Sequence, residues 1–325
     1  MTQTPKDIIA TIKQNNDQIK HVIFTGCGAS MADLYPAYYF VAQESQRLSV
    51  QIMQANEFNY ATPKFVGADT IVITASLGGT TPESIAATKH ARELGAQVIT
   101  LSHNPDSPIV KAAEFVLIHG FEEDYAHKTE KMTMALQLAI EIVNQFEGYE
   151  FYDEAQTAFD GLFDLINHEV QMAQGAAKEF AQRYQYVDKI YVLGSGATFG
   201  TAYSTASFLF MEMQWITGTT INSGEFFHGP FELALKDAPY LLFMNDGSTR
   251  HLDARALEFL QRFDTKLTVI DAKDHNLASI ASPNVIDYFN PMLITGVMRI
   301  YADELSVARQ HPLTQRRYMW KLENY

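Results

Sequence analysis

Two side chains in the later half of the chain are suited to moving protons, Glu212 and His228. Glu212 stands in an apolar run that we expect to be helical, Phe208-Leu209-Phe210-Met211-Glu212-Met213-Gln214-Trp215. A carboxylate is costly to bury there unless it is paired or used, and a carboxyl group near apolar walls is suited to taking a proton from carbon. An imidazole gains and loses its proton near neutral pH. Together, the two residues predict acid–base chemistry.

His228 lies in a short stretch rich in glycine and proline, Asn222-Ser223-Gly224-Glu225-Phe226-Phe227-His228-Gly229-Pro230-Phe231-Glu232. Glycine and proline punctuate the backbone, so we expect a rigid turn after a short strand. A histidine held on such a turn can present a ring nitrogen to a ligand, and Glu225 of the same turn is a candidate binding residue. A lone histidine or glutamate is more often structural, so the prediction depends on Glu212 together with His228.

Two loops in the earlier half have the composition of an anion site, Gly26-Cys27-Gly28-Ala29-Ser30 and Ser76-Leu77-Gly78-Gly79-Thr80-Thr81. Each follows a predicted strand and precedes a predicted helix, where backbone N–H groups and the helix dipole face a ligand. The same pattern fits tight turns with capping hydroxyl groups, but two such loops in one half favour an anion site. The candidate binding residues are Cys27, Gly28, Ser30, Ser76, Gly78, Thr80 and Thr81.

The elements that must position these loops alternate between short strands and helices. Apolar runs rich in β-branched residues predict strands at 22–25, 50–53, 70–75 and 97–101, and helices are expected at 5–19, 31–45 and 84–94. This alternation is typical of a parallel sheet covered by helices on both faces, a three-layer α/β/α arrangement.

The chain also repeats itself. Val22–Ser30 matches Ile190–Thr198 at an offset of 168, and the same offset carries Glu57-Phe58 onto Glu225-Phe226 and Gly79-Thr80-Thr81 onto Gly247-Ser248-Thr249. We therefore predict two copies of one α/β unit, residues 1–150 and 151–325, with a helical segment at 153–184 between them. The earlier copy carries the hydroxyl-rich loops and the later copy carries the acid–base pair.

Composition excludes several classes of protein. The chain has 325 residues, with 24 Lys and Arg against 38 Asp and Glu, so its net charge of −14 argues against nucleic-acid binding. Its ten histidines are scattered, and a single cysteine, Cys27, allows neither a thiolate metal site nor an intrachain disulfide. Without a membrane-length apolar run or a signal-peptide pattern, we expect a cytoplasmic protein that meets no membrane.

A dinucleotide site is disfavoured because Met31 stands where the third glycine of G-x-G-x-x-G belongs, and no acidic residue completes the fingerprint. The nucleophile motif G-x-S-x-G of serine hydrolases does not occur. We therefore expect neither a bound dinucleotide nor a metal.

These motifs resemble tandem sugar isomerase (SIS) domains, and the resemblance covers nearly the whole chain. The chain looks like the isomerase half of glucosamine-6-phosphate synthase without its glutaminase domain. Within that superfamily, the stretch 211–215, the motif His228-Gly229-Pro230-Phe231-Glu232 and the ending Arg316-Arg317-Tyr318-Met319-Trp320-Lys321 are most similar to fructosamine-6-phosphate deglycases of the fructoselysine-6-phosphate type.

The resemblance implies a dimeric enzyme that needs no cofactor and splits a 6-phosphorylated Amadori compound with water into glucose 6-phosphate and a free amine. It places the phosphate on hydroxyl groups matching Ser30, Ser76 and Thr81, and the proton-transferring glutamate at Glu212, sixteen residues before His228. That histidine assists ring opening and comes from the partner subunit in relatives, so we expect a homodimer with its site at the subunit interface.

The sequence departs from the family pattern at two phosphate-loop positions, where a glutamine and a serine are replaced by Leu77 and Gly78. This suggests that backbone N–H groups or Thr80 replace the lost side-chain donors. The family's C-terminal lysine matches Lys321 loosely.

Three readings stay open. The first is the deglycase. The second is an enzyme for aldose–ketose isomerisation or for deamination of glucosamine 6-phosphate, because the same proton shuttle serves these reactions. The third is a regulator that binds a sugar phosphate. The sequence names neither the amine, whether lysine, asparagine or another, nor the choice between fructosamine and glucosamine linkage.

Overall fold

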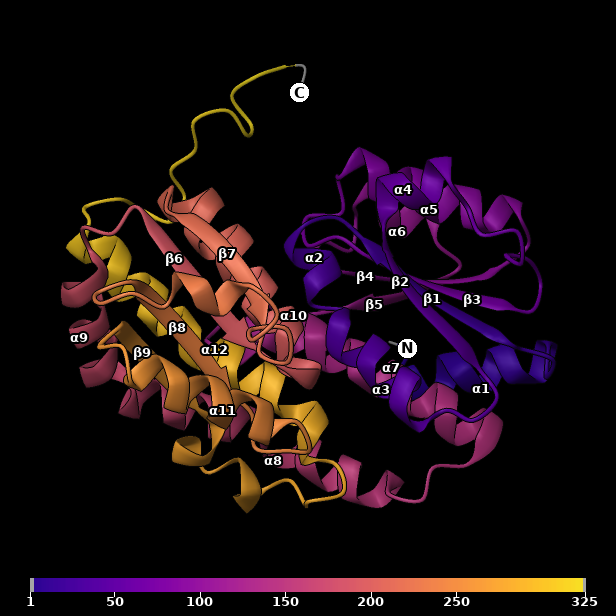
Figure 1. Ribbon diagram of the computed structural model, residues 1–325. Coiled ribbons are helices and arrows are strands. Elements are labelled where there is room, and N and C mark those ends of the chain that lie inside the picture. Colours follow the sequence, from indigo (N-terminus) through magenta and orange to yellow (C-terminus); the bar gives the residue numbers. More distant parts are fainter. Residues whose placement is uncertain (1–2, 324–325) are drawn as a thin grey trace. The chain divides into compact units, whose positions relative to one another are not determined.

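The computed structural model describes residues 3–323 and divides the chain into two compact units, Met1–Phe159 and Asp160–Tyr325. Each unit contains its own parallel β-sheet flanked by helices (Figure 1). The prediction of two copies of a three-layer α/β/α unit is confirmed. The division between the units falls inside a long helix, α8 (Tyr152–Met172), nine residues beyond the predicted boundary at 150.

The first unit has a five-stranded sheet in the order β2-β1-β3-β4-β5, with all strands parallel. Helices α1, α3 and α7 lie on one side of the sheet and α4, α5 and α6 on the other (Figure 1). The strands are β1 (His21–Gly26), β2 (Ser49–Gln54), β3 (Thr70–Ala75), β4 (Gln97–Ser102) and β5 (Phe115–Ile118). The helices are α1 (Pro5–Asn15), α2 (Ala29–Ala32), α3 (Tyr35–Glu44), α4 (Ala55–Tyr60), α5 (Pro82–Glu93), α6 (Pro108–Ala112), the 3₁₀ turn η1 (His127–Thr129) and α7 (Glu130–Glu147).

The second unit has a four-stranded parallel sheet in the order β7-β6-β8-β9. Helix α12 packs against α9, and α11 packs against β8. The strands are β6 (Lys189–Gly194), β7 (Thr217–Asn222), β8 (Pro239–Met244) and β9 (Lys266–Asp271). The α-helices after α8 are α9 (Gln174–Tyr184), α10 (Phe199–Ser204), α11 (Arg250–Gln261) and α12 (Ile286–Ala308). The other helical segments are η2 (Gly196–Thr198), the π-helix η3 (Thr205–Glu212), η4 (Pro230–Leu233), η5 (Ala272–His275) and η6 (Leu277–Ser279).

The central strands are covered on both faces. Every residue of β3, with sequence TIVITA, is buried, and so is every residue of β8, with sequence PYLLFM. A continuous apolar run, rather than an alternating one, is what a strand needs when helices cover both faces of its sheet. This is why the strands were recognisable from sequence.

The internal repeat is confirmed by strand positions and register. β6 and β7 follow β1 and β2 at an offset of 168, and α11 follows α5 at the same offset. His21 pairs with Thr70 and Tyr191 with Tyr240, which is the same separation in both sheets. The register slips by one residue only at β9, because Ile71 pairs with Gln97 whereas Pro239 pairs with Lys266.

Two helix predictions were wrong. The single helix expected at 31–45 is two helices, α2 and α3, because Pro36 has no N–H and fits only in the first turn of a helix, which is where it lies in α3. The first helix ends at Asn15 rather than at residue 19. Neither β5 nor α7 was predicted.

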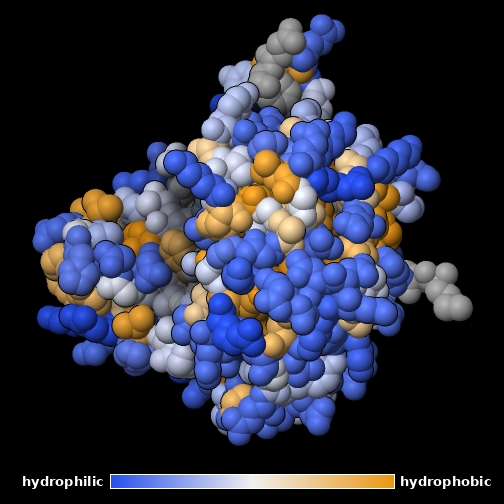
Figure 2. Space-filling view, turned by 90° about the vertical axis from the view of Figure 1, so that its right-hand side faces the viewer, coloured by the Kyte–Doolittle hydropathy of each residue, from blue (hydrophilic) through white to orange (hydrophobic). Residues whose placement is uncertain are grey.

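Hydrophilic residues cover most of the face shown in Figure 2. In the first unit, the large hydrophobic side chains of Tyr60 and Leu94 are exposed. Within residues 3–323, no helix has the length and apolar character needed to cross a membrane.

Gly79 gives a first testable prediction. Its φ is +68°, and a Cβ atom would lie 2.0 Å from Ser107 Oγ. Gly79→Ala should therefore lower the free energy of unfolding by roughly 2–4 kcal/mol, from left-handed backbone strain and overpacking together. Urea denaturation measures the loss.

The neighbouring glycine is a matched control. At Gly78 the nearest atom to an added Cβ is Thr80 Oγ1 at 3.8 Å, and its φ lies outside the left-handed region. Gly78→Ala should leave the free energy of unfolding unchanged or raise it slightly. Equal losses in the two variants would show that the loop is not held as described.

Candidate active site in two parts

In the first unit, the two predicted anion loops leave the same end of the sheet. β1 and β3 are neighbours, and their last residues, Gly26 and Ala75, pair with each other. β2 lies on the far side of β1 and β4 on the far side of β3, so the chain leaves this point in opposite directions. Such a switch point at the carboxyl ends of parallel strands is where open α/β sheets bind ligands.

The loop after β3 brings two predicted hydroxyl groups together. Ser76 Oγ and Thr81 Oγ1 are 3.1 Å apart, and Ser76 is buried. When one hydroxyl donates to the other, one proton of the pair stays free for a ligand. Gly78 and Thr80 are exposed on the same loop, where they can meet an incoming group.

The loop after β1 turns at Gly28, whose φ is +59°. Cys27 is half-buried, and burial raises the pKa of its thiol. Gln54 Nε2 donates to its sulfur at 3.4 Å. The Cys27 thiol therefore stays protonated and is not a nucleophile, because the thiolate is the reactive form.

A buried lysine lies beside Ser30. Lys131 Nζ donates to Ser30 Oγ at 2.9 Å and pairs with Asp33 Oδ2 at 3.0 Å, while only 7% of its side chain is exposed. Because Ser30 Oγ accepts from an ammonium group, the hydroxyl's own proton is left to donate elsewhere. Burying an unpaired charge costs several kcal/mol. The contacts with Asp33 and Ser30 therefore hold the Lys131 ammonium group in place beside the loop.

His119 completes the surroundings of Lys131. Burial, together with the nearby Lys131 charge, lowers the pKa of His119 to about 4. Its Nδ1–H donates to the carbonyl of Gly120 at 2.7 Å. His119 is therefore neutral at physiological pH and adds no charge, which leaves Lys131 as the cation next to Ser30.

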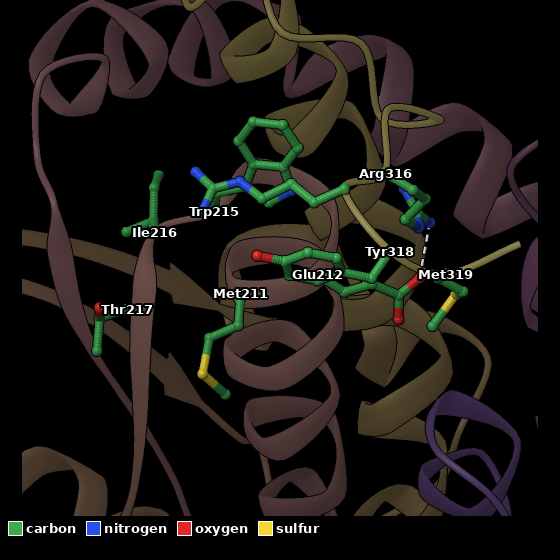
Figure 3. A pocket seen from close by; sticks show the side chains of 9 residues that line it. Met211, Glu212, Trp215, Ile216, Thr217, Arg316, Tyr318 and Met319 are labelled. Carbon is green, nitrogen blue, oxygen red and sulfur yellow. Dashed lines mark hydrogen bonds and ion pairs between the residues drawn. The ribbon is translucent and has the colours of Figure 1, made fainter. Parts of the chain in front are cut away.

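In the second unit, Glu212 is the last residue of the π-helix η3. π-Helical turns are rare and often mark functional positions. The carboxylate is 22% exposed, and Arg316 Nη2 donates to its Oε1 at 2.6 Å. Figure 3 shows the two side chains pointing toward each other, with Trp215 and Tyr318 beside them. The partner that a carboxylate among apolar residues requires is thus supplied by the C-terminal segment.

Arg316 is held from several directions. Its Nη1 donates to the carbonyls of Leu313 and Gln315, and only 7% of its side chain is exposed. Glu212 and Arg316 line a pocket of about 510 Å³ (Figure 3). The other residues of the pocket are Met211, Trp215, Ile216, Thr217, Arg317, Tyr318 and Met319.

The turn predicted around His228 is confirmed. It follows β7 directly, the His228 N–H donates to the Glu225 carbonyl at 2.9 Å, and Phe226 anchors the turn by being fully buried. The side chains of Glu225 and His228 are exposed, so both are available to a ligand or another subunit.

The structure does not join every predicted residue. Among residues 3–323 of this chain, Glu212 and His228 form neither a hydrogen bond nor an ion pair with each other. Lys321 is exposed near the end of the described chain and has no ion pair there. In the described residues, no group of three or more His, Cys, Asp or Glu side chains could hold a metal ion.

Sequence reasoning missed Lys131 and gave Arg316 no role. Lys131 shares one buried face of α7 with Ala135 and Leu138, and a lysine on such a face is the signal that could have revealed it. Arg316 lies 104 residues after Glu212, so only the fold brings them together.

Comparisons with known proteins agree on one family for this chain. A model of the SIS domain matches residues 17–145, which cover most of the first unit. Fructosamine deglycase FrlB of Bacillus subtilis (strain 168) is 35% identical over 94% of this chain and 93% of its own length. Fructoselysine 6-phosphate deglycase of Escherichia coli O157:H7 is 25% identical over 94% of this chain and 87% of its own.

A solved structure from Salmonella typhimurium LT2, provisionally described as a phosphosugar isomerase, superposes with a TM-score of 0.94. It is 38% identical in sequence, and the match covers 98% of both chains. The predicted tandem arrangement therefore recurs in a relative along the whole chain. The chain belongs to the family of tandem SIS-domain proteins that includes fructosamine deglycase FrlB.

Proposed function

We propose that the protein is a fructosamine-6-phosphate deglycase. It hydrolyses a 6-phosphorylated Amadori product, such as fructoselysine 6-phosphate, to glucose 6-phosphate and the free amine. The observation that carries the proposal is the Glu212 carboxylate, held by Arg316 at the wall of a pocket large enough for a small organic group. The names of the two deglycase relatives support the substrate class.

The reaction needs a base that moves one proton between neighbouring carbons. His228 assists opening of the sugar ring. Glu212 then removes a proton from C1 of the open ketosamine, which gives an enaminol, and returns a proton to C2. The resulting C1 imine adds water, and its C–N bond breaks to release the amine and the aldehyde of glucose 6-phosphate. Each proton transfer contributes roughly 10²–10⁴-fold.

The phosphate belongs at the loops after β1 and β3 of the first unit. Ser30 and the Ser76–Thr81 pair supply hydroxyl donors, and Lys131 supplies a positive charge directly behind Ser30. A phosphate held there fixes the sugar and limits its orientation at the reacting carbons. Lys131 thus compensates for the side-chain donors that Leu77 and Gly78 lack.

Lys131→Met should weaken phosphate binding. Removing a charge that acts through a serine hydroxyl should raise KM for the phosphorylated substrate roughly 10–100-fold, with a smaller change in kcat. Calorimetric titration with inorganic phosphate measures the same loss without turnover. Asp33→Asn is the matched control, because it removes the partner anion and should not weaken phosphate binding; weaker binding in both variants would make the pair structural only.

Arg316→Met should reduce turnover more than substrate affinity. Without its charge-assisted hydrogen bond, the Glu212 carboxylate loses both its position and its compensating cation, and we expect kcat to fall roughly 10–100-fold. Arg316→Lys should restore part of the rate, because it keeps the charge but not the planar fork. Steady-state kinetics of the wild type, Arg316→Met and Arg316→Lys measure both effects. An unchanged kcat in Arg316→Met would show that Arg316 does not position Glu212 for the reaction.

We propose that the active protein is a homodimer. Glu212 and His228 share no hydrogen bond or ion pair within the described residues, and His228 is exposed, so a second subunit is the natural source of the histidine in each site. The cytoplasmic location stays a prediction.

One assay separates this function from its rivals. The protein is incubated with fructoselysine 6-phosphate, or with fructose 6-phosphate and ammonia, or with glucosamine 6-phosphate. A deglycase releases glucose 6-phosphate and lysine in equal amounts from the first mixture. An isomerase or deaminase converts only the others, and a regulator binds without turnover.

A further inference from the structure

The pocket beside Glu212 is lined by a second arginine, Arg317, whose charge is not neutralised by an ion pair within residues 3–323. Arg316 is committed to Glu212 and to two backbone carbonyls. Arg317 lines the same pocket and forms no ion pair among residues 3–323. With Glu212 and Arg316 balancing each other, the pocket carries one net positive charge, although the whole chain carries −14. It is therefore suited to one anionic group.

The guanidinium of Arg317 is held in place by an aromatic ring. Its Cζ lies 3.9 Å from the centroid of the Trp215 ring. Stacking on one face leaves the N–H edges of a guanidinium free, and those edges match a carboxylate in a two-bond fork. The arrangement presents a positioned cation rather than a freely moving one.

Trp215 itself is held in an unusual conformation. Its φ is +55°, in the left-handed region that large side chains rarely adopt, and such strain persists only where the surroundings enforce it. The ring of His311 packs edge-on against it with a centroid distance of 4.3 Å, and Gln214 Nε2 donates to the His311 carbonyl at 2.8 Å. Trp215 thus contacts both His311 and Arg317, and the three side chains form one wall.

His311 does not compete with Arg317 as a cation. Burial lowers the pKa of His311, and the nearby Arg309 and Arg317 charges lower it further. The imidazole is therefore neutral at physiological pH, and the free positive charge of the wall resides on Arg317.

The chemistry of the reaction says which anion arrives here. In a ketosamine the amine nitrogen is bonded to C1, the carbon from which Glu212 takes its proton. The amine must therefore enter the pocket that Glu212 lines, whereas the phosphate on C6 lies at the far end of the sugar. When the amine is an amino acid joined through its α-nitrogen, its carboxylate is only two bonds beyond that nitrogen.

We propose that this pocket is the leaving-group subsite and that Arg317 binds the carboxylate of an amino acid glycated on its α-nitrogen. The inference rests on the proposed deglycase function and deepens it. The balanced Glu212–Arg316 pair lets the carboxylate approach without facing an unshielded negative charge. The apolar wall formed by Met211 and Ile216 leaves room for the amino-acid side chain.

The test uses two substrates that differ only in the carboxylate, the 6-phosphofructosyl adducts of glycine and of methylamine. We expect kcat/KM of the wild-type protein to favour the glycine adduct by roughly 10-fold or more, the size of one charge-assisted hydrogen bond. In Arg317→Met this preference should fall to about one, because the glycine adduct loses its partner. Arg262→Met is the control, because Arg262 also lies over aromatic rings but directly follows α11 and does not line this pocket.

Binding is measured in parallel by calorimetry on the inactive His228→Asn variant, with and without Arg317→Met, so that the answer does not depend on turnover. A wild-type protein that processes both adducts equally well, or an Arg317→Met variant that loses affinity for both alike, overturns the carboxylate assignment; the second result would place the sugar phosphate on Arg317. Failure of the wild type to process either adduct contradicts the deglycase function, and the two affinities still decide whether Arg317 recognises the carboxylate.

Discussion

Replacing Glu212 by glutamine reduces kcat for a phosphorylated fructosamine by roughly 10²–10⁴-fold or more, the usual contribution of a positioned base. Glutamine has nearly the same shape but cannot accept the C1 proton, so neither the enaminol nor the imine forms. Because the sugar and phosphate contacts stay in place, KM should change much less than kcat. Release of glucose 6-phosphate, followed with a coupled dehydrogenase, measures the effect.

Two controls protect this result. Circular dichroism and inorganic-phosphate binding should match the wild type, because Glu212 lies in the second unit and the proposed phosphate loops lie in the first. Glu258→Gln, on the exposed face of α11, should keep full activity because it makes the same chemical change away from the pocket. A Glu212→Gln variant within tenfold of wild-type turnover is incompatible with the base assigned here.

A mixed dimer of two inactive variants recovers activity. Glu212→Gln and His228→Asn homodimers should each be almost inactive. In a heterodimer built from one chain of each, one site combines both mutations and the other combines Glu212 of one chain with His228 of the other. One of two equivalent sites is then intact, so the heterodimer should show about half of the wild-type activity.

The experiment needs the two chains to carry different affinity tags, so that only heterodimers are purified after co-expression. Each homodimer, passed through the same purification, gives the background rate. A pure heterodimer as inactive as its parents would mean that Glu212 and His228 of the same chain act together, and the shared site would be abandoned. A monomer in solution would have the same consequence.

The fold was predictable because its signals are local and repeated. Fully buried strands such as β3 and β8 read as continuous apolar runs, and the offset between the two copies persists in strand positions and register. The errors came from weaker signals. A short strand such as β5 has few residues to form a pattern, and Pro36 was a helix start inside what looked like one long helix.

The candidate site was partly predictable. Ser76 and Thr81 are five residues apart, so their contact follows from a single loop. Lys131 reaches Ser30 across 101 residues and Arg316 reaches Glu212 across 104, and no local pattern reports such contacts. The sequence could indicate that the Glu212 carboxylate needed a partner, but only the fold identifies that partner.

The most direct test of the account is the identity of the first hexose phosphate released from a phosphorylated fructosamine. A proton shuttle through Glu212 moves the carbonyl from C2 to C1 before the C–N bond breaks, so wild-type protein should release glucose 6-phosphate and an equal amount of amine. Rapid-quench sampling with product identification by NMR resolves the first turnovers. Fructose 6-phosphate as the first product would mean direct cleavage without proton transfer, and it would contradict the role given to Glu212.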